Sequence, residues 1–355
     1  AAAPSPLDGA VAGYREVTGA APLYAKFAYG FWQCKEHYKT QDELTAAAAT
    51  FRQKAIPLDA IVQDWRYWGD MGWGPQWDPK VYPDPKGMVA NLSAANLKLM
   101  VSVWSRFDAK TTFYQQMDRK GWLLNGTGSV GNGYYDAWHP DARALFYSFS
   151  KAAHFDNGVE ALWLDATEPE HFPHLNQTIH LGSANEYFNS YSLMTTMAIA
   201  DGLRKDFPKA QGARAFSLTR SSFAGQQRTG AALWSGDISS TWDSLRRQVA
   251  ASLSYALSGH AYWCEDIGGF FRPNGQHDDP EYRALLIRWF QFGAFTPIFR
   301  VHGTNGDTEL WEFGDETMGA INASAIRLRY RLLPYNYASF RRAAAGYTVQ
   351  RALPL

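Results

Sequence analysis

Short apolar runs rich in β-forming residues alternate with longer helical patterns along this 355-residue chain, which predicts a parallel sheet flanked by helices. Eight runs are predicted strands: residues 25–33, 58–65, 98–104, 159–166, 213–220, 230–237, 261–266 and 297–303. The helical patterns cover residues 41–55, 86–96, a short stretch near Leu145, and residues 185–207, 241–259, 281–295 and 327–342.

Eight strands in this order predict an α/β fold, a closed (β/α)8 TIM barrel. An open doubly wound sheet is the alternative, but no G-x-G-x-x-G motif follows the first run. The Gly- and Asn-rich stretch after Ser105 predicts an extended loop between a strand and its helix.

We expect three parts along the chain. Residues 1–20 are predicted to be a loose lead-in or linker, and residues 21–345 the barrel. Residues 346–355, "GYTVQRALPL", resemble the start of a β element that is cut off. The chain is therefore expected to be a domain of a longer protein.

The charge balance argues against two classes of partner. Lys plus Arg and Asp plus Glu number 34 each, so nothing favours nucleic acid or an anionic membrane, and no apolar run is long enough to span a bilayer. Fourteen Trp, 19 Tyr and 21 Phe suit a cleft for neutral sugars. Cys34 and Cys264 form either one long bridge or two free thiols, and no metal-ligand spacing is present.

Charged and aromatic residues stand at the predicted carboxyl ends of the strands, where TIM barrels place their active sites. They are Asp64, Trp65, Trp104, Arg106, Asp165, Arg220, Asp237, Glu265, Asp266, Arg300 and His302. Any one of them could be a solvated strand end, and His302 alone could be a core histidine. The set, with acids directly after apolar residues in "LWLD" and "LWSGD", favours a pocket.

Two carboxyl groups across a pocket can cleave a glycosidic bond, one as nucleophile and one as acid, at about 5 Å separation in retaining enzymes. We expect Arg220 to keep Asp165 ionised, and apolar neighbours to raise the pKa of Asp237. Glu168 and Glu170 are rival nucleophiles, but they lie beyond the strand end, where the chain is less rigid. Asp266 is a rival acid.

Four motifs resemble the catalytic barrel of glycoside hydrolase family 31, the retaining α-glycosidases. They are "WLDATEPE", "RSSFAGQQRTGAALWSGD", "EDIGGFF" and "RWFQFGAFTPIFRVHG". The resemblance runs from about residue 25 to residue 337, and "GFWQCKEHYKTQDEL" and "DATEPE" are most similar to the α-xylosidase branch. Family members normally carry β domains on both sides of the barrel, and this chain contains neither.

The resemblance implies roles for particular residues. Asp165 would be the nucleophile and Asp237 the general acid/base. The substrate-binding residues would be Asp64, Trp65, Trp104, Trp163, Glu168, Arg220, Trp234, Asp266, Phe270 and His302. No cofactor and no metal are expected.

The predicted function is that of a retaining exo-α-glycosidase, an α-xylosidase that releases terminal α-xylose from oligosaccharides such as xyloglucan fragments. The alternatives are an α-glucosidase, α-galactosidase or transglycosylase using the same site, and a carbohydrate-binding barrel without turnover. A sugar-polymer substrate also suggests a periplasmic or extracellular location. The sequence makes no prediction of the oligomeric state.

Overall fold

A computed structural model describes residues 5–124, 132–169, 177–208, 214–343 and 346–352. Eight parallel strands form one sheet in chain order: β1 (Phe31–Cys34), β2 (Ala60–Gln63), β3 (Lys98–Trp104), β6 (Ala161–Asp165), β9 (Ser217–Thr219), β10 (Ala231–Trp234), β11 (Trp263–Cys264) and β12 (Phe299–Val301). The last pair closes the sheet, because the Ile298 N–H donates to Trp263 O at 3.1 Å and the Ile267 N–H donates to Arg300 O at 3.3 Å. The predicted TIM barrel is therefore confirmed.

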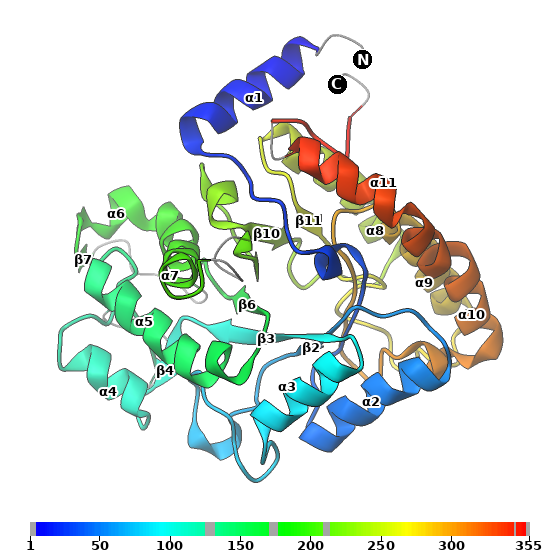
Figure 1. Cartoon of the computed structure of the whole chain (residues 1–355), viewed down its shortest axis with the longest axis horizontal. Helices are drawn as coiled ribbons and strands as arrows, with labels where there is room; N and C mark the ends of the chain where they lie inside the picture. Colours follow the sequence, from blue (N-terminus) through cyan, green and yellow to red (C-terminus); the bar gives the residue numbers. More distant parts are fainter. Residues whose placement is uncertain (1–4, 125–131, 170–176, 209–213, 344–345, 353–355) are drawn as a thin grey trace.

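Helices surround the strands (Figure 1). They are α2 (Gln41–Gln53), α3 (Pro85–Ala94), α5 (Pro140–Ala153), α7 (Tyr191–Asp206), α8 (Trp242–Leu257), α9 (Pro280–Gly293), α10 (Gly314–Ile321) and α11 (Arg327–Ala343). The helix expected near Leu145 is α5, which is 14 residues long rather than short. Between β9 and β10 the described residues form only the 3-10 turn Gln226–Thr229.

The loop predicted after Ser105 contains elements of its own. The strands β4 (Arg106–Asp108) and β5 (Asn132–Tyr134) pair in antiparallel fashion, and α4 (Thr112–Asp118) lies between them in the chain. Further along, the short strands β7 (Thr178–Ile179) and β8 (Gly182–Ser183) pair, and α6 (Ala184–Tyr187) precedes α7.

The prediction that residues 1–20 are a loose lead-in is wrong for most of that segment. Residues Pro6–Thr18 form the helix α1, which begins with a reciprocal capping box between Ser5 and Asp8. The buried Arg15 donates to Ala343 O at 2.8 Å and ties α1 to the end of α11, beside which it lies in Figure 1. Residues 346–352 contain no strand, and residues 353–355 lie outside the described residues, so no β element is seen there.

Alternate residues of β1, β2, β3 and β6 belong to different buried clusters. In β6, Ala161 and Trp163 belong to the cluster that fills the barrel, whereas Leu162 and Leu164 pack against the helices. This is the two-residue period of a strand. Asp165 continues the inward series and therefore lies at the mouth of the barrel. Cys34 and Cys264 also belong to the inner cluster, as buried free thiols.

Candidate active site

A cavity of about 390 Å³ lies at the carboxyl ends of the strands. Its lining combines acids, cations and indole rings: Glu36, Asp64, Trp65, Trp73, Trp104, Arg106, Trp163, Asp165, Arg220, Asp237, Phe270 and His302. Sequence alone predicted nine of these twelve residues as site residues. Mixed polar and aromatic walls of this kind suit a small neutral polar ligand such as a sugar.

Asp165 is fixed at the end of β6 by the backbone that follows it. Its Oδ1 accepts a hydrogen bond from the Ala166 N–H at 2.6 Å, and Ala166 has a left-handed φ of 51°. This turn sends the chain back toward β9, where Thr167 Oγ1 lies 2.6 Å from Thr219 Oγ1. A residue in this backbone region persists only when its surroundings hold it there, so the turn is built to position the neighbouring carboxylate.

Arg220 links two of the predicted acids. Its Nη1 lies 3.5 Å from Asp165 Oδ1, and its Nε and Nη2 each donate to Glu168 at 2.9 Å. The bidentate contact fixes the plane of the guanidinium group. Glu168 itself does not line the cavity, so it acts on the site through Arg220. Glu170, the other rival nucleophile, lies outside the described residues.

The electrostatics of Asp165 differ from the sequence-based expectation. Burial raises the pKa of Asp165 to about 7, although Arg220 and the Ala166 N–H favour its charged form. The side chain of Asp237 is exposed at the cavity, and the expected effect of apolar neighbours on its pKa stays a prediction. The less exposed carboxyl of the pair is therefore Asp165.

Asp64 and His302 meet at the base of the site, with 3.7 Å between Asp64 Oδ2 and His302 Nε2. Burial and the charge of Asp165 raise the pKa of Asp64. Burial and the charge of Arg300 lower the pKa of His302. Both shifts favour the uncharged forms, so we describe this contact as a polar pair rather than a strong ion pair.

Two other predicted binding residues lie behind the cavity wall. Trp234 packs edge-on against Trp163, with ring centroids 5.1 Å apart. Asp266 is fully buried and pairs with Arg300, whose guanidinium lies 4.9 Å from the Trp163 ring. Neither lines the cavity. They support Trp163, which does.

Three lining residues were not predicted from the sequence as catalytic or substrate-binding residues. Glu36 extends the inward series Trp32 and Cys34 of β1, so strand periodicity could have found it. Arg106 was noted at a strand end, and its guanidinium stacks 4.5 Å from the ring of Trp73. Trp73 lies in an irregular segment after β2, where no periodicity indicates which indoles face the site.

A family model for the glycosyl hydrolases family 31 TIM-barrel domain matches residues 21–339. The chain belongs to glycosyl hydrolase family 31. The α-xylosidase of Saccharolobus solfataricus is 42% identical over 98% of this chain and 47% of that protein. Alpha-glucosidase 2 of Bacillus thermoamyloliquefaciens is 32% identical over 99% of this chain and 46% of that protein.

Among solved structures, the family 31 α-xylosidase from a soil metagenome, complexed with xylose, has a TM-score of 0.91 at 34% identity. The match covers 98% of this chain and 55% of that one. The chain therefore spans about half the length of these relatives.

No three His, Cys, Asp or Glu side chains in the described part of the chain are grouped so that they could hold a metal ion. No described helix combines the length and the apolar character needed to cross a membrane.

The raised pKa of Asp165 predicts the low-pH side of the activity profile. The predicted nucleophile Asp165 must be ionised to attack, so kcat/KM on an aryl α-xyloside should fall as pH drops through about 7. Arg220→Met removes the positive charge that favours ionisation, and the low-pH limb should therefore move to higher pH. Arg246→Met on the exposed face of α8 is the control. A limb at the same pH in Arg220→Met and the wild type would contradict this assignment.

Proposed function

We propose that this family 31 barrel carries the catalytic site of a retaining exo-α-glycosidase. The observation that supports this most strongly is the placement of Asp165 and Asp237 in one aromatic-walled cavity. Asp165 is ion-paired and its side chain is only 13% exposed, as suits a fixed nucleophile. Asp237 is exposed in the same cavity, as suits a group that protonates a leaving oxygen and then activates water.

The proposed reaction has two displacements. The Asp165 carboxylate attacks the anomeric carbon while Asp237 gives its proton to the departing oxygen, so a covalent glycosyl-enzyme forms. Asp237, now a carboxylate, removes a proton from water, whose oxygen replaces Asp165 at the anomeric carbon. The configuration at that carbon is inverted twice and therefore retained.

The proposed sugar is a terminal α-linked xylose. Two similarities support it: the relative named an α-xylosidase at 42% identity, and the structure of an α-xylosidase complexed with xylose. Trp65, Trp104 and Phe270 all line the cavity and would leave little room for the hydroxymethyl group of a hexose. The Bacillus relative favours α-glucosidase activity as the second candidate.

Hydrolysis of aryl α-xyloside, α-glucoside and α-galactoside at equal concentrations tests the choice of sugar. We expect kcat/KM to favour the xyloside by at least about tenfold, because one excluded carbon group is worth about 10–200-fold in a shaped pocket. Asp165→Ala provides the blank for contaminating activity. A preference for the glucoside would select the second candidate, and turnover of none of the three by the wild type would reject both.

A further inference from the structure

Glu36 is a carboxylate of the cavity to which neither the sequence motifs nor the proposed reaction gives a role. It lies two residues beyond the last residue of β1, and its side chain is partly exposed in the cavity. One carboxylate oxygen, Oε1, accepts a hydrogen bond from the indole Nε1 of Trp65 at 2.9 Å. Among the described residues, no cation forms an ion pair with Glu36, so its negative charge is turned toward the site rather than used in a structural pair.

Glu36 is also close to the acid at the base of the site. Its charge contributes to the raised pKa of Asp64, and both carboxyl groups line the same cavity. A neutral sugar presents adjacent hydroxyl groups, each of which can donate one hydrogen bond. Two neighbouring carboxyl groups offer acceptors for two such donors, and a carboxylate acceptor gives the stronger, charge-assisted bond.

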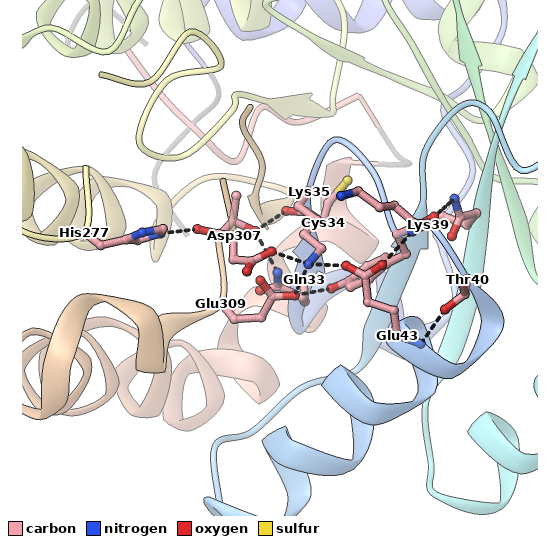
Figure 2. A network of polar contacts seen from close by, with 12 residues as sticks. Gln33, Cys34, Lys35, Lys39, Thr40, Glu43, His277, Asp307 and Glu309 are labelled. Carbon is pink, nitrogen blue, oxygen red and sulfur yellow. Dashed lines mark hydrogen bonds and ion pairs between the residues drawn. The ribbon is translucent and has the colours of Figure 1, made fainter. Parts of the chain in front are cut away.

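The backbone that carries Glu36 is fixed by its neighbour Lys35, which points the other way. Figure 2 shows the Lys35 ammonium group among carboxylates. Its Nζ lies 2.5 Å from Asp307 Oδ1, 2.8 Å from Glu43 Oε1 and 3.4 Å from Glu309 Oε1, and the side chain is only 6% exposed. Lys35 directly precedes Glu36 at the end of β1, so holding Lys35 in this network restricts where the backbone of Glu36 can lie.

The same network joins β1 and the residues after it to the segment that follows β12. Gln33 donates from Nε2 to Thr308 Oγ1, and Thr308 Oγ1 donates to Cys34 O, each at 2.8 Å. The Glu36 N–H donates to Gly303 O at 3.1 Å, one residue beyond His302. The segment holding Glu36 is thus tied to the segment holding His302, which contacts Asp64.

We propose that Glu36 binds a hydroxyl group of the terminal sugar beside Asp64, and that Lys35 is a positioning residue that aims it. This inference rests on the proposed glycosidase function and adds a specificity residue to it. A sugar inside a chain has lost one of its hydroxyl groups to a linkage. Acceptors held in place for free hydroxyls therefore favour a chain end, which accounts for exo action.

The test of Glu36 combines protein variants with substrate analogues. Glu36→Ala should lower kcat/KM on an aryl α-xyloside by about 10- to 100-fold, the usual range for a hydrogen bond to a charged group. The 2-, 3- and 4-deoxy xylosides are then compared in both proteins. Removal of the hydroxyl that Glu36 binds should cost the wild type much and Glu36→Ala little, since the pair is coupled. If the loss from Glu36→Ala and the loss from each missing hydroxyl simply multiplied in kcat/KM for all three hydroxyls, no hydroxyl would be coupled to Glu36 and the proposal would be overturned.

A second variant separates direct sugar binding from an effect through Trp65. Trp65→Phe removes the indole donor but keeps a ring beside Glu36. If Glu36 only oriented Trp65, then Trp65→Phe would reproduce the loss seen in Glu36→Ala, and no deoxy sugar would be coupled to Glu36. We expect instead that, in the Trp65→Phe background, Glu36 is still coupled to one hydroxyl group of the sugar.

The positioning role of Lys35 has its own variants. Lys35→Met should raise KM more than it lowers kcat, and Lys35→Arg should recover most of the loss because it restores the charge. Lys151→Met removes a surface lysine paired with Asp156 at 2.6 Å and should leave activity unchanged. Equal losses in Lys35→Arg and Lys35→Met, or a change in kcat alone, would reject the positioning role.

Failure of the proposed function can be told apart from failure of this inference. If the wild type cleaves no aryl α-glycoside, the proposed reaction is wrong, but the cavity can still be titrated with free xylose and its deoxy analogues by tryptophan fluorescence. Weaker binding of xylose to Glu36→Ala, with coupling to one hydroxyl, would support the role of Glu36. Equal affinity of both proteins for xylose would overturn it.

Discussion

Asp165→Ala should lower kcat on an aryl α-xyloside by at least about 10⁴-fold, the largest loss expected from a single substitution in this barrel. The reason is chemical. Without the carboxylate no covalent glycosyl-enzyme can form, although the remaining lining residues can still bind the sugar. KM should therefore change far less than kcat. Steady-state kinetics on aryl α-xylosides measures both.

An external nucleophile distinguishes the loss of Asp165 chemistry from a loss of structure. The shortened side chain leaves space for azide, which would attack the anomeric carbon from the side that Asp165 occupied. Azide should therefore restore turnover of a substrate with a good leaving group and give a glycosyl azide of inverted configuration. Asp165→Asn fills that space and should not be rescued.

Glu160→Ala is the matched control for position on the same strand. Glu160 directly precedes β6, at the end opposite to Asp165, where its side chain pairs with Lys98 at 3.7 Å; it does not line the cavity. Its loss should leave kcat nearly unchanged. Residual activity in Asp165→Ala equal to that of Glu160→Ala, or a rescued product of retained configuration, would sink the nucleophile assignment.

The fold could be predicted from the sequence because each barrel strand corresponds to a short apolar run of residues. The ends of the strands were less predictable. Residues 25–33 form one apolar run, yet Lys26–Tyr29 is a 3-10 turn and β1 begins only at Phe31. Apolar residues are needed in a buried 3-10 turn as well as in a buried strand. Hydrophobicity alone therefore does not locate the first residue that pairs with β2 and β12.

The helix α1 was not predicted, because the composition of residues 1–20 is typical of a linker. Gly, Ala and Pro dominate the first twenty residues and suggest a linker, but Ser5, Pro6 and Asp8 form an N-terminal capping pattern. Arg15 is then buried against the end of α11, a contact some 330 residues away in sequence that no local pattern can predict.

The candidate site was predictable where strand periodicity and motif agreed. Asp64 and Asp165 continue inward-facing series of β2 and β6, so their presence at the cavity follows from the two-residue period. Asp266 continues the inward series of β11, yet its pairing with Arg300 keeps it behind Trp163. Only the packing of side chains from several strands determines that Asp64 and Asp165 line the cavity whereas Asp266 does not.

Asp237→Ala should show a loss that depends on the leaving group. Asp237 is exposed at the cavity, where it can reach the departing oxygen. Poor leaving groups need its proton, so kcat/KM on a xylosyl disaccharide should fall by about 10²- to 10⁴-fold, whereas an activated aryl xyloside should lose much less at this step. With activated substrates, breakdown of the glycosyl-enzyme then limits turnover, because no base activates water.

Azide needs no such base and should restore turnover with retained configuration, the opposite outcome to Asp165→Ala. A loss of equal size across aryl xylosides whose leaving groups differ by several pKa units would contradict the role of Asp237 as acid. Ser239→Ala, two residues further along the same loop, is the control and should behave as wild type with every leaving group.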